Sequence, residues 1–64
     1  MIVYDRLWVL LKEKKVSQYK LKNEGISNST LTRLKPNQPV STETIEKLCT
    51  ILECRVEDVM EYIN

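Results

Sequence analysis

Apolar residues recur along this chain at the spacing of one helix face, and this spacing restricts the possible folds more than any other feature. They stand at positions i, i+3, i+4 and i+7 in three places, which are Tyr4-Leu7-Trp8-Leu11, Ile45-Leu48-Cys49-Leu52 and Val56-Val59-Met60-Ile63. Such spacing is typical of amphipathic α-helices. It predicts helices near residues 5–14, 42–52 and 56–63, and Ser41 is placed to cap the second of them.

The middle of the chain consists of shorter segments separated by cap and turn residues. Ser17 and Ser27 can cap helices near 17–24 and 27–35. Gly25 is the only glycine and stands where the first of these must end, a position that favours a left-handed backbone. Pro36 and Pro39 end the second. We therefore expect five helices and no sheet, with residues 1–3 as a short strand or an ordered tail.

A chain of 64 residues has room for one domain, spanning residues 1–64. Its core should come from the inward positions of the helices: Trp8, Leu11, Leu21, Ile26, Leu31, Leu34, Ile45, Leu48, Leu52 and Val59. No apolar stretch reaches the roughly 18 residues that a membrane span needs, and the N-terminus does not resemble a secretory signal. We expect no membrane partner and a cytoplasmic location.

Charge is distributed unevenly between the two parts of the chain. Residues 1–38 hold eight basic and three acidic residues, whereas residues 39–64 hold two basic and six acidic ones. A basic half is consistent with a face turned towards phosphate, although two ordinary solvated surfaces would give the same distribution.

Residues 17–35 follow the order of a helix-turn-helix: a short helix, a Gly-Ile-Ser turn and a second short helix. If Leu31 and Leu34 point inward, helical geometry turns Ser29, Thr32 and Arg33 outward, with Asn28, Thr30 and Lys35 at the flanks. Arginine can pair with guanine and asparagine with adenine, while hydroxyls serve bases or phosphates. A solvated polar helix face is the alternative interpretation of this segment taken alone.

In these features the chain resembles the Cro/C1-type (XRE) helix-turn-helix family of phage repressors and bacterial regulators. The similarity covers about residues 5–62, and it lies in Ser17-Gln18, Leu21, Gly25-Ile26-Ser27 and the segment 29–34, with Leu48, Leu52 and Val59 in the tail. The resemblance implies an all-α, compact five-helix domain of the lambda-repressor-like type.

The resemblance also implies roles for single residues. Asn28, Ser29 and Arg33 match positions that contact base edges, and Thr32 joins them through its outward direction. Ser27, Thr30, Asn37 and Gln38 match positions that contact phosphates, and Gln18 matches a glutamine that braces the recognition helix and reaches the DNA backbone. Ser17 and Lys35 complete the predicted backbone contacts, because one opens the first helix of the unit and the other adds positive charge beside the DNA face.

Several positions depart from the family pattern. The spacing from Gln18 to Gly25 is one residue short, and Lys22 replaces a small residue where the two helices cross, so the first helix of the unit should be shortened or shifted. Asn37 replaces a glycine, but asparagine tolerates a left-handed turn. Glu53 also stands where the family commonly uses glycine, and Arg55 is a poor cap for the helix that follows.

The usual parts for catalysis are missing, since the chain has no histidine and no glycine-rich phosphate loop. Cys49 and Cys54 lack further ligands for a zinc site. We expect both to be reduced, free of metal and mostly buried. The prediction is a protein that is not an enzyme and has no cofactor and no evident small-molecule ligand.

The predicted function is a sequence-specific, DNA-binding transcriptional regulator of bacterial type, and we expect a repressor that binds double-stranded DNA. The alternative is a protein-interaction module or antitoxin-like adaptor on the same fold, with exposed Trp8 or the acidic half as its contact. We also expect a homodimer, because one short helix touches too few base pairs to select a genomic site. Its contact is expected at Met60, Tyr62 and Ile63, with help from Ile2 and Val3.

Overall fold

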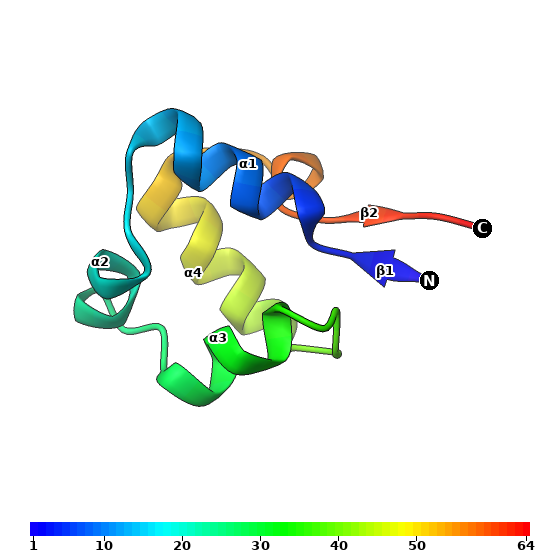
Figure 1. Ribbon diagram of the computed structural model, residues 1–64, viewed down its shortest axis with the longest axis horizontal. Helices are drawn as coiled ribbons and strands as arrows, with labels where there is room; N and C mark the ends of the chain where they lie inside the picture. The colour runs from blue at the N-terminus through cyan, green and yellow to red at the C-terminus, as the bar shows by residue number, and fades with distance from the viewer.

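The computed structural model describes residues 1–64 and contains four α-helices, one turn of 3-10 helix and two short strands. In chain order these are β1 (Ile2–Val3), α1 (Asp5–Lys14), α2 (Gln18–Asn23), α3 (Asn28–Leu34), α4 (Thr42–Leu52), η1 (Val56–Asp58) and β2 (Glu61–Tyr62). In Figure 1, α4 lies between α1 above and α3 below, and the two strands project together on the right. The helix-turn-helix unit therefore forms the left and lower part of this view.

Three serines start three of the four helices. The side-chain oxygens of Ser17, Ser27 and Ser41 each accept a hydrogen bond from the backbone N–H three residues later, at 3.2 Å. A serine at this position satisfies one of the N–H groups that have no partner within the helix, which contributes about 1 kcal/mol. The predicted caps are confirmed.

Left-handed residues end several of the helices. Gly25 follows α2 with a φ of 108°, which confirms the turn predicted from the sequence. Glu53 ends α4 with a φ of 50°, at the position where the family commonly has glycine. A side chain in this conformation costs roughly 1 kcal/mol or more, so Glu53 carries local strain at this helix end.

The core lies between the helices and is close to the predicted one. Nine of the ten predicted residues are buried, and Trp8 is half-buried against them. Tyr4 and Leu7, which lie on the predicted apolar face, are buried as well, and so is Val3 in β1. Because Trp8 packs on the core, it does not supply the exposed contact required by the protein-interaction alternative.

The predicted fifth helix at 56–63 is wrong, and so is the expectation that the chain has no sheet. Only η1 is helical there, after which β2 pairs with β1 in an antiparallel two-stranded sheet, with Ile2 opposite Tyr62 and Val3 opposite Glu61. The Ile63 N–H donates to the Met1 carbonyl at 2.8 Å, which extends the pairing by one residue. The backbone groups of this segment therefore bond to the other end of the chain instead of within a helix.

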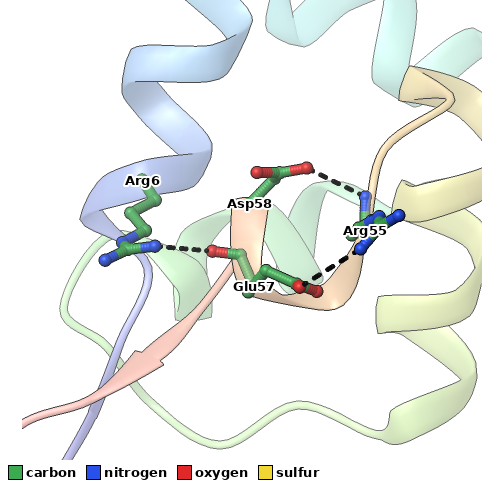
Figure 2. Close-up of polar contacts among 4 residues, drawn as sticks. All are labelled: Arg6, Arg55, Glu57 and Asp58. Atoms are coloured by element: carbon green, nitrogen blue, oxygen red, sulfur yellow. Dashed lines mark hydrogen bonds and ion pairs between the residues drawn. The ribbon is translucent and has the colours of Figure 1, made fainter.

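Polar contacts also hold η1 as a single turn (Figure 2). The Arg55 backbone N–H donates to an Asp58 carboxylate oxygen at 3.0 Å, and Arg6 of α1 donates to the Glu57 carbonyl at 3.1 Å. The bond from Arg6 connects η1 to α1. Together they fix the entry to β2 against α1.

Candidate nucleic-acid interface

Helix α3 presents one polar face to solvent. Leu31 and Leu34 are buried on its inner side, whereas Ser29, Thr32 and Arg33 are exposed, in agreement with the outward direction derived from helical geometry. Asn28 and Lys35 are exposed beside them. Figure 1 shows α3 at the lower edge of the molecule, with no other element beyond it in this view.

Hydroxyl groups gather where α3 begins. The Ser27 Oγ lies 2.8 Å from the Thr30 Oγ1 and 3.2 Å from the Ser29 Oγ, and it also accepts the Thr30 N–H. These contacts order the three side chains before any ligand arrives. Ser27 therefore has a structural role as a cap, in addition to the phosphate contact predicted from the family.

The Thr32 hydroxyl is engaged within the helix. Its Oγ1 donates to the carbonyl of Asn28 at 2.9 Å. With its proton used in this way, Thr32 offers DNA a methyl group and oxygen lone pairs. The methyl group can contact the methyl group of thymine, and the lone pairs can accept a hydrogen bond from the amino group of adenine or cytosine. An acceptor atom on a base is a poorer partner, because the hydroxyl proton is already engaged.

The loop after α3 has a role that sequence analysis missed. Asn37 adopts a left-handed φ of 59°, as the resemblance allowed, and its Oδ1 accepts the backbone N–H of Tyr4 at 2.9 Å. The Gln38 N–H donates to the Arg33 carbonyl at 2.9 Å, which holds the loop on the end of α3. Asn37 thus joins the predicted phosphate-binding loop to the N-terminal segment, and only the fold brings these two parts together.

The start of α2 is exposed, with Ser17 and Gln18 both at the surface. No hydrogen bond joins the Gln18 side chain to α3, whose side-chain hydrogen bonds run among Ser27, Asn28, Ser29, Thr30 and Thr32. Helix α2 has only six residues, in agreement with the shortening expected from the reduced spacing, and Lys22 is exposed. The Gln18 side chain remains available to solvent.

Most basic side chains of the N-terminal half form no salt bridge. The two salt bridges join Arg6 to Glu61 at 3.2 Å and Arg55 to Glu57 at 4.0 Å. The other basic side chains of the first 38 residues are all exposed and lie in no salt bridge: Lys12, Lys14, Lys15, Lys20, Lys22, Arg33 and Lys35. Cations without a carboxylate partner can neutralise phosphates without first breaking an ion pair.

The shape of the α3 face favours a groove-shaped partner over a small molecule. Four hollows mark the surface, and none of them is lined by a residue of α3. No group of three or more potential ligand side chains that could hold a metal ion is present, and no helix has the length and hydrophobicity to cross a bilayer. A convex polar helix with nearby cations fits the major groove of DNA.

Cys49 and Cys54 are free thiols, and both are half-buried where the prediction had them mostly buried. Burial raises the pKa of Cys54 from 9.0 to about 11, and the neighbouring Cys49 adds to the shift. Because the thiolate is the nucleophile and the metal ligand, Cys54 is unreactive near neutral pH. This pair contributes to packing rather than to the polar face of α3.

Similarities to known proteins also indicate a helix-turn-helix DNA-binding domain. A crystal structure of the transcriptional regulator VanUg is similar over 97% of this chain and 84% of that one, with a TM-score of 0.89 and 30% identity. No curated protein matches the chain. The sequence profile of the Cro/C1-type HTH DNA-binding domain matches residues 6–64. This chain belongs to the Cro/C1-type helix-turn-helix DNA-binding domain family.

Proposed function

We propose that this protein is a sequence-specific transcriptional regulator, and more narrowly a repressor, that inserts α3 into the major groove. The observation that carries the proposal is the α3 face, where Arg33 and its polar neighbours are exposed opposite the buried Leu31 and Leu34. The similarity to VanUg, described as a transcriptional regulator, supports a regulatory role. Repression is the narrower choice because the family includes phage repressors.

The proposed contacts fall into two classes. Asn28, Ser29, Thr32 and Arg33 read bases, since their side chains lie along the exposed face of α3. The backbone contacts are proposed for Ser17, Gln18, Ser27, Thr30, Lys35, Asn37 and Gln38, which lie at the starts of α2 and α3 and after the end of α3. Contacts of the second class position the domain without carrying sequence information.

We also propose that two copies bind one operator. A recognition helix of seven residues touches only a few base pairs, too few to select one site in a genome. In a two-fold dimer the helices enter successive major grooves about 34 Å apart, so the preferred site is a near-palindrome with half-sites roughly 10 base pairs apart.

The test begins by selecting bound sequences from a random DNA pool and titrating the winner at several salt concentrations. We expect Arg33→Ala to weaken binding by about 1–3 kcal/mol and to relax the preference at one base position. We expect Lys35→Ala to weaken binding to all sequences alike and to reduce the salt slope by about one. Arg55→Ala is the matched control, because Arg55 is an exposed arginine at the start of η1, outside the segment 17–35 that holds α2 and α3.

Two results would contradict the proposal. If Arg33→Ala binds the selected site as well as the unmodified protein does, the α3 face is not the reading surface. If DNA binding is absent at low salt while a protein partner is recovered in a pull-down, the adaptor alternative stands instead.

A further inference from the structure

Both cysteines of the chain lie at the C-terminal end of α4. Cys49 belongs to the last turn of the helix, which ends at Leu52, and Cys54 is the second residue after that end. The backbone N–H groups of Glu53 and Cys54 both donate to the Cys49 carbonyl, the second at 3.1 Å. Glu53 has the left-handed φ of 50°. This is a Schellman-type helix end, and the two cysteines stand at the residues joined by its longest hydrogen bond.

Side chains at these two positions frequently contact each other in such helix ends, because the left-handed residue turns the chain back over the last helical turn. The electrostatics of the pair agree with this contact. Burial is the main reason that the pKa of Cys54 is raised, and the Cys49 thiol adds to the shift, so the two sulfur atoms lie within electrostatic reach of each other. A segment of six residues thus brings two thiols together.

An apolar hollow opens beside this pair. Its volume is about 360 Å³, and Cys49 lines it together with Ile45, Val56 and Met60. Both cysteines are half-buried, so their thiols are neither sealed in the core nor fully in water. A small ion can reach Cys49 through this hollow without unfolding of the chain.

The ligand atoms available here are soft sulfurs. The Met60 thioether lines the same hollow as Cys49, so three of the four sulfur-containing side chains of the protein lie at or beside it. The chain has no histidine, and no aspartate or glutamate completes a group of three metal ligands with the two cysteines. Thiolate and thioether ligands select monovalent copper over hard cations, and this ion accepts coordination by two thiolates alone. Zinc would require two further ligands.

The charge at the pair also favours a cation between the two sulfur atoms. Two neighbouring thiolates repel each other, and a positive ion between them replaces this repulsion by attraction. Besides burial and Cys49, the charges of other elements act in opposite directions, since Asp58 of η1 raises the pKa of Cys54 and Lys14 of α1 lowers it. The neighbouring elements therefore supply no cation that would take the place of a bound ion.

We propose that Cys49 and Cys54 form a binding site for one monovalent copper ion, held between their two sulfur atoms at the end of α4. Each thiol releases its proton to solvent and donates a sulfur lone pair, so copper remains monovalent and no electron is transferred. The Cys54 thiol carries its proton near neutral pH, and the ion displaces this proton on binding, as metal ligation by cysteine requires.

Metal binding at this place has a structural consequence. Glu53 lies inside the ring of residues 49–54 that the ion closes, and its left-handed backbone carries local strain. A bridge from Cys49 to Cys54 holds that conformation in place. Since the ion binds the folded pair, it stabilises the native state in addition to occupying the thiols.

A titration of the full chain with Cu(I), in the absence of oxygen and with a chromogenic Cu(I) chelator as competitor, tests the site. We expect one ion per chain. Cys49→Ser and Cys54→Ser should each lower the affinity at least about a hundredfold, because loss of a ligand exceeds the roughly 10–100-fold effect of losing an outer partner. Met60→Leu is the matched control, since it removes a sulfur atom from the same hollow and keeps a similar apolar volume. Its affinity should equal that of the unmodified protein.

Thermal unfolding provides a second measurement. Saturating Cu(I) should raise the Tm of the unmodified protein and of Met60→Leu, and it should leave the Tm of both serine variants unchanged. Zinc at the same concentration should raise none of them, because two thiolates leave its coordination incomplete. The metal-free unfolding curves establish that each variant is folded.

The proposal fails if Cu(I) binds Cys54→Ser as tightly as the unmodified protein, or if Met60→Leu loses as much affinity as the serine variants do. One ion for every two chains would also overturn it, because the metal would then lie between copies. None of these results bears on base reading by α3, which lies outside residues 49–54.

Discussion

The bond between Asn37 and Tyr4 gives a sharp test of how the loop after α3 is held. In Asn37→Ala the Tyr4 N–H, which is partly buried, loses its acceptor, and alanine must adopt the left-handed φ of 59°. An unsatisfied buried donor costs about 1–3 kcal/mol. The left-handed conformation adds about 1 kcal/mol for alanine relative to asparagine. Since the donor is only partly buried, we expect a total loss of about 2–3 kcal/mol.

Such a loss is large for this chain. A folded chain of 64 residues has a total stability of about 3–10 kcal/mol, and each kcal/mol shifts its Tm by about 4–8 °C. Urea unfolding followed by circular dichroism, in the absence of DNA, measures the change. Asn37→Gly should lose less than Asn37→Ala, by about 1 kcal/mol, because glycine adopts the left-handed conformation without strain.

Asn37→Asp is the matched control, since it keeps both an acceptor oxygen and tolerance of the left-handed conformation. We expect its free energy of unfolding to stay within about 0.5 kcal/mol of the unmodified value. If Asn37→Ala is as stable as Asn37→Asp, the side chain does not hold the loop on the N-terminal segment, and the reasoning fails.

Further predictions concern the core, a cap and a thiol. Leu34→Ala, at a fully buried position in α3, should cost about 2–5 kcal/mol, whereas Val9→Ala, at an exposed position, should change stability by less than about 0.5 kcal/mol in thermal unfolding. Ser27→Ala should cost about 1 kcal/mol through the lost cap, and an unchanged Tm would contradict that role. Burial raises the pKa of Cys54 from 9.0 to about 11, so its alkylation should be slow at pH 8 and should accelerate up to pH 11; rapid labelling at pH 8 would refute this. The raised pKa favours the folded state below pH 9, and this contribution should be lost as the pH rises from 9 to 11.

Much of the candidate site was predictable because its signals are local. The caps at Ser17 and Ser27 bond to N–H groups only three residues away, and the left-handed turn at Gly25 depends on the absence of a side chain. The outward direction of Arg33 follows from the helical repeat once Leu31 is placed inside. The internal bonds of Thr32 and Asn37 were not predicted, since side-chain conformation and distant partners decide them.

The end of the chain shows what the sequence alone does not determine. Val56, Val59, Met60 and Ile63 have helical spacing, yet Val56 and Ile63 are exposed and only the first turn is helical. The spacing of apolar residues indicates which positions could share a helix face, but it contains no information about a strand partner elsewhere in the chain. The backbone of residues 61–63 bonds to residues 1–3 because the fold brings the two termini together beside α1. Local caps and periodicity therefore determined the four helices and the exposed polar face of α3, whereas tertiary packing decided that the chain ends in a paired ribbon with Tyr62 at its surface.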